Sequence, residues 1–270
     1  MTKAEFAQMM GCEKTVIGMV HLLPLPGSPR YGGSMRAVFE AALRDLKVLE
    51  GAGVKAAIIE NFGDVPYGTE NEFITLACMT SVAAQLRERT TMKLGINVQY
   101  NCAVEEWGMA YASGANFIRV EAFVETRVGT HGITYPAAPA LMREKGRYPA
   151  PTLLFCDVNT KHTEPLVPVP IADSIHEAIE EGADALIVTG VVTGQNPTLE
   201  QVQEFAAAAG DTPVLLGSGV NEKNAAEFFA VADGAIIGSS FKEEGNVWNP
   251  VDPQRVQSFM QTLTEAGYQV

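Results

Sequence analysis

The sequence predicts an α/β protein of the TIM type, with one (β/α)8 barrel domain spanning residues 1–270. Three observations lead to this prediction. The length of 270 residues is close to the ~250 residues typical of such a barrel. Short apolar runs alternate with longer helical patterns, as in a parallel sheet covered by helices. Two glycine–serine turns lie in the last quarter of the chain, where the loops after the last two barrel strands commonly build a phosphate site.

Eight apolar runs are expected to form the strands. Each is short and followed by polar or glycine-rich residues, which is typical of a buried parallel strand. A doubly wound open sheet is the competing architecture, but eight regular units with no apparent reversal of order favour a closed barrel. The predicted strands are Val16–His21, Lys55–Glu60, Lys93–Gln99, Asn116–Glu121, Thr152–Asp157, Asp184–Thr189, Pro213–Leu216 and Gly234–Gly238.

Helical patterns fill the segments between these runs. Several strands are preceded by a small turn such as Gly114-Ala115, Gly182-Ala183-Asp184 or Ala232-Asp233. Such turns suit helix-to-strand loops in which glycine ends the helix. The predicted helices are Met35–Glu50, Asn71–Arg89, Ala103–Ala112, Ile171–Glu181, Leu199–Ala208, Asn224–Phe229 and Pro253–Ala266.

Composition and charge narrow the class of partner. Hydrophobic residues make up 47% of the chain and charged residues 19%, which is typical of a compact soluble protein. The net charge of −13 argues against nucleic acid and anionic membranes as principal partners, because neither attracts an acidic protein over long range.

The cysteines and the N-terminus indicate a cytoplasmic location. Cys12, Cys78, Cys102 and Cys156 are widely spaced and form no CxxC pattern, so we interpret them as reduced thiols. The first residues contain no signal-peptide pattern, and no run approaches the ~18 apolar residues of a membrane span. We therefore expect no integral membrane association.

The two glycine–serine turns are Gly217-Ser218-Gly219 and Gly238-Ser239-Ser240. Each follows a predicted strand and precedes a helical segment. Glycine lets the backbone approach an anion, serine adds a hydroxyl donor, and a helix N-terminus supplies unpaired N–H groups. Either turn alone is as well explained as an ordinary strand-to-helix connection, but the pair favours a phosphate site.

Polar residues end most of the predicted strands, and in a parallel barrel these ends meet at one mouth where catalysis occurs. Strand alternation places Arg119 and Glu121 on one face, pointing into the barrel, where we expect them to pair. A structural ion pair is the equal alternative to a catalytic role. Asn97 and Gln99 also face inward as candidate substrate donors. The strand-end residues are His21, Glu60 with Asn61, Asn97 with Gln99, Arg119 with Glu121, Asp157, and Thr189 with Gly190.

Asp157 is the strongest single candidate, since a carboxylate after a buried run suits a general base or a metal ligand. Asn159, Lys161 and His162 follow it in the loop, and a solvated polar loop is the alternative. A Schiff base at Lys161 is less expected, because the lysine lies four residues past the strand end and is expected to be solvated. Binding of a divalent metal is left as an open alternative, although no His-x-His or HExxH spacing indicates a metal site.

The chain resembles the BtpA/SgcQ family nearly end to end. Its long opening signature is Val16-Ile17-Gly18-Met19-Val20-His21-Leu22-Leu23-Pro24-Leu25-Pro26-Gly27-Ser28-Pro29. The resemblance continues through Glu60-Asn61-Phe62-Gly63-Asp64, Phe117-Ile118-Arg119-Val120, Asp157-Val158 with Lys161-His162, Asp184-Ala185-Leu186-Ile187-Val188, Gly217-Ser218-Gly219-Val220 and Asn249-Pro250-Val251-Asp252.

The family is similar to ribulose-phosphate-binding TIM barrels, and the resemblance therefore implies a phosphorylated ligand at the two glycine–serine turns. Its cyanobacterial namesake is associated with photosystem I biogenesis, whereas members in organisms without photosynthesis resemble proteins of sugar metabolism. The resemblance does not name a reaction.

The chain departs from the family pattern in the loops of the predicted mouth. Residues 97–102 read Asn-Val-Gln-Tyr-Asn-Cys, where relatives usually have Asn-Val-Leu-Arg-Asn-Asp. Thr130-His131-Gly132 replaces Asp-Gln-Gly, and Asn159 replaces a histidine. These differences put a shared substrate or metal preference in doubt.

Together these features predict a cytoplasmic enzyme that binds a small phosphorylated metabolite and performs isomerase or lyase chemistry. The expected proton-transfer residues are Asp157, Glu60, Glu121 and His21, with Arg119 and Lys161 stabilising a developing anion and His162 nearby. The alternative function is a non-catalytic biogenesis or assembly factor. A homo-oligomer is compatible with both.

Overall fold

Within residues 1–189 and 197–270, which the computed structural model describes, eight parallel strands close into a barrel. The order around the barrel is β1-β11-β10-β9-β7-β4-β3-β2, with β2 pairing back to β1. All eight predicted strands form, and the predicted TIM-barrel fold is confirmed. The strands are β1 Thr15–His21, β2 Ala56–Glu60, β3 Lys93–Asn97, β4 Phe117–Val120, β7 Leu153–Val158, β9 Ala185–Val188, β10 Val214–Leu216 and β11 Gly234–Ile237.

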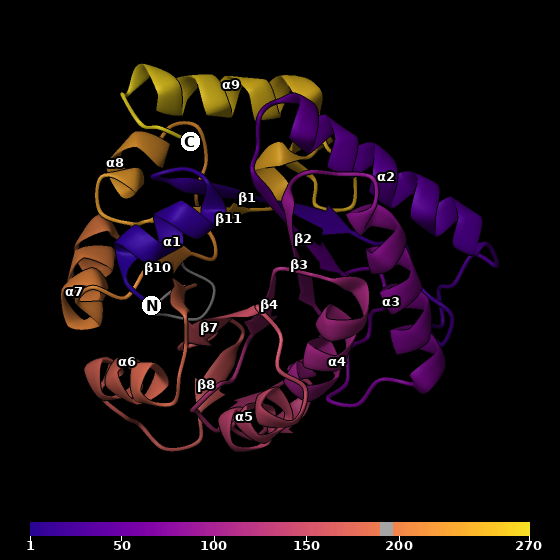
Figure 1. The fold of residues 1–270 in the computed structure, drawn as a ribbon, viewed down its shortest axis with the longest axis horizontal. Coiled ribbons are helices and arrows are strands. Elements are labelled where there is room, and N and C mark those ends of the chain that lie inside the picture. The colour runs from indigo at the N-terminus through magenta and orange to yellow at the C-terminus, as the bar shows by residue number, and fades with distance from the viewer. Residues whose placement is uncertain (190–196) are drawn as a thin grey trace.

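A helix follows each barrel strand along the described chain, and these helices form the outer ring in Figure 1. The seven predicted helices all occur, with ends that differ by at most two residues. The ring consists of α2 Met35–Gly51, α3 Phe73–Arg87, α4 Ala103–Ser113, α5 Ala138–Arg147, α6 Ile171–Glu180, α7 Leu199–Ala209, α8 Ala225–Phe229 and α9 Pro253–Glu265. None of the described helices is both long enough and apolar enough to cross a bilayer.

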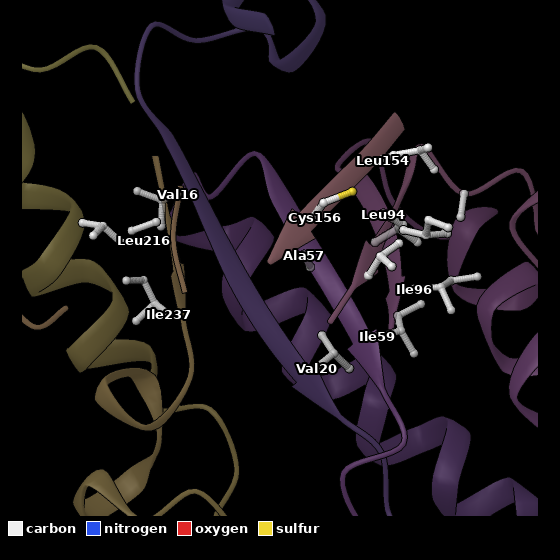
Figure 2. Packing of buried hydrophobic residues seen from close by; sticks show 14 of the residues in the cluster. Val16, Val20, Ala57, Ile59, Leu94, Ile96, Leu154, Cys156, Leu216 and Ile237 are labelled. Carbon is white, nitrogen blue, oxygen red and sulfur yellow. The ribbon is translucent and has the colours of Figure 1, made fainter. Parts of the chain in front are cut away.

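Side-chain alternation along the strands divides the core into two parts. On β1, Val16 and Val20 pack outward against the helices, while Ile17 and Met19 point into the barrel. Figure 2 shows the outward layer, including Val16 and Val20. Neighbouring strands repeat the pattern, so the barrel is filled with side chains rather than hollow.

Small and large residues complement each other inside the barrel. A Cβ on Gly95 would lie 2.1 Å from Cε2 of Phe117, so the ring occupies the space that a side chain on β3 would need. Phe117 also stacks on Phe155 of β7 at a centroid distance of 4.4 Å. Helix α1, Lys3–Met10, closes this apolar end, with Phe6 packing on Phe155 at 5.7 Å. In Figure 1 α1 lies across the barrel.

The small turns before the strands hold neighbouring strands in register. The side chains of Asn116, Asp184 and Asp233 accept hydrogen bonds from the backbone N–H of Leu94, Leu154 and Val214, at 3.0, 2.9 and 2.9 Å. Each polar residue therefore satisfies an amide of the adjacent strand at the end of the barrel opposite its mouth.

Several elements were not predicted. Helix α1 begins with a capping box between Thr2 and Glu5, and α5 carries Pro139 in its first turn, where proline is tolerated. Three short strands, β5 Arg127–Gly129, β6 Gly132–Thr134 and β8 Thr163–Pro165, form an antiparallel sheet in the order β6-β5-β8. This small sheet joins the loop after β4 to the loop after β7.

Candidate active site

A cavity of about 910 Å³ lies at the carboxyl ends of the barrel strands. It brings together residues from β1, β2, β4, both glycine–serine turns and the loop after β7. Convergent polar groups in a large concave pocket mark a candidate active site. The predicted residues that line it are His21, Glu60, Gln99, Arg119, Glu121, Lys161, His162, Gly217, Ser218, Gly219, Gly238, Ser239 and Ser240.

Four predicted residues lie behind the cavity wall rather than in it, and each holds another group in place. Asn61 accepts a hydrogen bond from the Gln99 amide at 2.7 Å, and Thr189 Oγ1 accepts one from the Lys161 amide at 3.1 Å. Asn97 and Asp157 hold Glu121 and Arg119, as described below. Gly190 lies outside the described residues.

Arg119 is clamped by Asp157 at the floor of the cavity. Its Nε donates to Oδ1 at 3.0 Å and its Nη2 donates to Oδ2 at 2.9 Å, with Arg119 6% and Asp157 1% exposed. The sequence predicts Glu121 as the partner of Arg119, and this pairing prediction is wrong. Arg119 faces Phe155 on the adjacent strand, so Asp157 is a cross-strand neighbour, whereas Glu121 lies two residues further along Arg119's own strand.

Glu121 belongs to a second buried group that includes Glu106, on the first turn of α4. Asn97 Nδ2 donates to Glu121 Oε1 at 2.7 Å and lies 3.4 Å from Glu106 Oε1. Glu106 Oε1 also accepts from the Val98 amide at 2.5 Å, while its Oε2 finds no partner among the described residues. Asn101 N–H donates to Glu121 Oε2 at 3.0 Å.

Burial is the main cause of the raised pKa of both Glu121 and Glu106. It raises the pKa of Glu121 to about 8, although the charge of Arg119 acts in the opposite direction. Burial and the neighbouring Glu121 raise the pKa of Glu106 well above its usual range. Sequence reasoning missed Glu106. A glutamate in the first turn of a helix is ordinarily solvated and interacts favourably with the positive end of the helix dipole.

Glu60 is the other buried carboxyl of the cavity, at the end of β2. Burial raises its pKa, and the positive charges of Arg119 and Lys161 oppose that rise. A carboxyl that lines a cavity and has a raised pKa is suited to proton transfer.

The loop of residues 159–163 is fixed at several points. Thr160 Oγ1 donates to the Glu121 carbonyl, and Thr163 Oγ1 donates to the Thr160 carbonyl at 2.7 Å. Buried Arg127 of the small sheet donates from Nε to Thr163 Oγ1 and from Nη2 to the Thr163 carbonyl, both at 2.9 Å. The small sheet therefore holds the loop that carries Lys161 over the mouth.

Stacked rings contribute to the lining of the cavity. His21 stacks on Phe62 at a centroid distance of 4.3 Å, and Phe62 contacts Trp248 at 4.7 Å. Burial, together with the positive charge of Lys242, lowers the pKa of His21 to about 3, so its imidazole is neutral at pH 7. Tyr100 stacks on the His131 ring at 3.9 Å.

Several lining residues escaped sequence reasoning. Phe62, Tyr67 and Tyr100 lie beyond the strand ends, where aromatic residues look like ordinary loop packing.

Both glycine–serine turns line the cavity. No described residue accepts a hydrogen bond from the amides of Ser218, Gly219, Ser239 or Ser240. Two of the serine hydroxyls have other roles: Ser218 Oγ donates to the Thr189 carbonyl, and Ser240 Oγ donates to the Val220 carbonyl at 2.8 Å. The exposed Ser239 therefore offers the more accessible hydroxyl.

Gly217 is required by packing. A Cβ there would lie 2.5 Å from Thr189 Cγ2 and 2.6 Å from Ile187 Cγ2, inside the barrel. Gly238 is less tightly packed, since the atoms nearest to a Cβ there are Met19 Cγ at 3.8 Å and His21 Cε1 at 3.9 Å.

Residues 1–189 and 197–270 contain no cluster of three His, Cys, Asp or Glu side chains able to hold a metal ion.

Comparison with known proteins identifies the family. Residues 12–265 match the model of the family described as the BtpA family. The chain belongs to this family. It is 35% identical to the photosystem I biogenesis protein BtpA of Synechocystis sp., over 93% of this chain and 88% of that protein. It is 38% identical to an uncharacterized protein of Pyrococcus furiosus, over 91% of this chain and 93% of that protein.

Solved structures support the fold. The structure of N-(5'-phosphoribosyl)anthranilate isomerase from Pyrococcus furiosus superposes with a TM-score of 0.57. The match covers 93% of this chain and 99% of that one at 14% sequence identity, a level at which the likeness concerns the fold alone.

Proposed function

We propose that this BtpA-family chain is a TIM-barrel enzyme that binds a small phosphorylated metabolite and performs isomerase or lyase chemistry by acid–base catalysis. One observation carries the proposal. A single cavity joins two glycine–serine turns to two cations and two buried carboxyls, and the amides of Ser218, Gly219, Ser239 and Ser240 in these turns have no acceptor among the described residues. This arrangement supplies a phosphate cradle beside groups that can move protons.

The phosphate is assigned to the amides of Ser218, Gly219, Ser239 and Ser240. Backbone N–H groups from two adjacent turns provide several donors to one dianion, and the Ser239 hydroxyl is free to add another. A barrel isomerase that acts on a phosphoribosyl compound shares the fold, which agrees with this assignment.

The chemistry is assigned to Glu60, Arg119 and Lys161, which line the same cavity. Glu60 is the proton-transfer residue, because it faces the cavity and its pKa is raised by burial. Arg119 and Lys161 stabilise negative charge that develops on the substrate. Asp157 orients Arg119, since both of its oxygens accept hydrogen bonds from the guanidinium.

Two further lining residues act in neutral form. Glu121 is mainly protonated at pH 7, because its pKa is about 8, and so can serve as a proton donor. His21 is uncharged at that pH and can accept or donate one hydrogen bond.

Thermal-shift measurements with sugar phosphates and nucleotides test the proposal. A ligand at 100 times its dissociation constant adds ~2.7 kcal/mol to the free energy of unfolding. Ser239→Asp places a negative charge in the cradle and should abolish the shift, whereas Ser81→Asp, on the exposed surface of α3, should leave it unchanged. A panel in which no phosphorylated compound raises the midpoint would contradict the proposal.

Tryptophan fluorescence gives an independent readout. Trp248 is 55% exposed and contacts Phe62, which lines the cavity, whereas Trp107 is fully buried in α4. Ligand binding should change the emission of the wild-type protein, and Trp248→Phe should remove that change while retaining the thermal shift.

The second candidate function is a non-catalytic biogenesis or assembly factor, as the name of the Synechocystis relative suggests for that protein. Exposed apolar side chains favour it: Val128 and Ile133 face each other across β5 and β6, and Leu166, Val167 and Val169 follow β8. Absence of any phosphate-dependent shift, together with aggregation relieved by Ile133→Lys, would support this alternative. A cytoplasmic location and a homo-oligomer stay predictions.

A further inference from the structure

Lys161 is half-buried and differs from the two buried cations Arg119 and Lys242 at the barrel mouth. Arg119 is held by Asp157 at 2.9 Å, and Lys242 by Asp45 at 3.0 Å. No described carboxylate lies within ion-pair distance of Lys161, although its side chain lines the cavity beside Glu60 and Arg119. A half-buried cation without an ionic partner is costly, so a lysine here gains by being neutral.

Hydrogen bonds and two turns fix the backbone around Lys161. Lys161 N–H donates to Thr189 Oγ1 at 3.1 Å, and the adjacent Thr160 is tied to the Glu121 carbonyl. Asn159 and His162 have φ values of 56° and 64°, so the chain turns sharply on both sides of Lys161. These turns fold the loop back over the mouth, and a lysine four residues beyond the strand end becomes part of the cavity wall.

We propose that Lys161 is a covalent catalyst whose Nζ forms an imine with the carbonyl carbon of a phosphorylated ketone or aldehyde. The inference rests on the proposed phosphate-binding function, because the two turns must hold the phosphate while the carbonyl reaches Lys161. Burial and the adjacent charge of Arg119 lower the pKa of Lys161 and outweigh the opposing charges of Glu60 and Asp157, which increases the fraction of neutral amine that can attack.

The step balances without any further reactant. The Nζ lone pair forms a bond to the carbonyl carbon, and the carbonyl oxygen leaves as water after taking one proton from the nitrogen and one from an acid of the cavity. The resulting iminium makes the neighbouring C–H acidic, and Glu60 takes that proton as the electron pair moves toward nitrogen. Reprotonation at carbon and addition of water release the product and restore the amine.

Borohydride trapping tests the imine directly. The wild-type protein is incubated with dihydroxyacetone phosphate, glyceraldehyde 3-phosphate or ribulose 5-phosphate, reduced, and analysed by intact mass and peptide mapping. We expect a phosphate-dependent adduct on Lys161. Lys14 is a matched internal control, because burial also lowers its pKa but it lies at the other end of the barrel, donating to the Ala232 carbonyl at 2.8 Å. Lys14 should carry no adduct.

Lys161→Arg and Lys161→Met separate covalent from electrostatic roles. Both variants should lose the adduct entirely, and Lys161→Arg should retain the phosphate-dependent thermal shift because the backbone amides of the two glycine–serine turns hold the phosphate. The unreduced wild type should also exchange the α-proton of the bound ketone with deuterium oxide, and the variants should not.

The outcomes distinguish the two proposals. A thermal shift without a trapped adduct overturns the imine and leaves the phosphate site standing. An adduct spread over several lysines, or one that persists in Lys161→Arg, also overturns it. Absence of both shift and adduct overturns the proposed function together with this inference.

Discussion

Removal of one partner from the buried Arg119–Asp157 pair should cost several kcal/mol. Asp157→Asn keeps the shape of the side chain but leaves the Arg119 charge buried with only one acceptor oxygen. Breaking such a pair typically costs about 3–5 kcal/mol of unfolding free energy. Glu60 and Glu121 moderate the loss, because both interact with Arg119 and ionise more readily once the negative charge of Asp157 is gone. We therefore expect about 3 kcal/mol at pH 7.

The pH dependence of this loss follows from Glu121. Its folded pKa of about 8 lies above the unfolded value, so the stability that it contributes to the wild type is lost as pH rises through 8. Because Asp157 is one of the charges that raise this pKa, the variant should lose less stability over the same range. The difference between the two proteins should therefore shrink between pH 6 and pH 9.

Urea unfolding followed by circular dichroism measures these quantities, provided that the slope of free energy against urea is the same in both proteins. A matched double variant, Arg119→Met with Asp157→Leu, removes both charges and should recover most of the loss, to within about 1 kcal/mol of wild type. A single variant that costs less than about 1 kcal/mol, or a double variant as unstable as the single one, would refute the reasoning.

Three further predictions concern the barrel interior, the cavity wall and the small sheet. Gly95→Ala places a methyl group against Phe117 and should cost about 1–3 kcal/mol by urea unfolding, with Phe117→Leu in the same chain recovering part of it. No loss would show that the ring can move aside. The folded pKa of His21 is about 3, so the stability that this residue contributes above pH 6.5 is lost as pH falls toward 3, by about 2 kcal/mol once partial exposure is allowed for. His21→Gln should lack that component, and parallel stability curves for the two proteins would contradict the prediction. Arg127→Met should lower stability by about 3 kcal/mol and speed hydrogen exchange of the Lys161 amide, because the charged hydrogen bonds that hold the loop are lost; unchanged exchange would count against this role.

Much of the fold could be predicted because it rests on local patterns. The apolar runs, their spacing and the turns between them predict eight strands, and the alternation of Ile118 and Val120 with Arg119 predicts which face of β4 points inward. The residues at the strand ends follow from the same rule, and the amino-acid sequence therefore suffices to predict that His21 and Glu60 lie at the mouth.

The pairing of these residues could not be predicted in the same way. Arg119 and Asp157 meet because β4 and β7 are neighbours with a particular register, even though β5, β6 and α5 lie between them in the chain. Glu106 joins the site from a helix, through Asn97, and nothing in its local sequence distinguishes it from a solvated glutamate.

By itself the sequence determined the barrel, the mouth and the chemical types gathered there, because hydrophobic periodicity and turn chemistry act over a few residues. Only the tertiary structure decided which carboxylate holds Arg119, which acid stays protonated, and that Lys161 folds back into the cavity. The physical reason is that burial and neighbouring charges set the pKa of each group, and both depend on contacts between segments far apart along the chain.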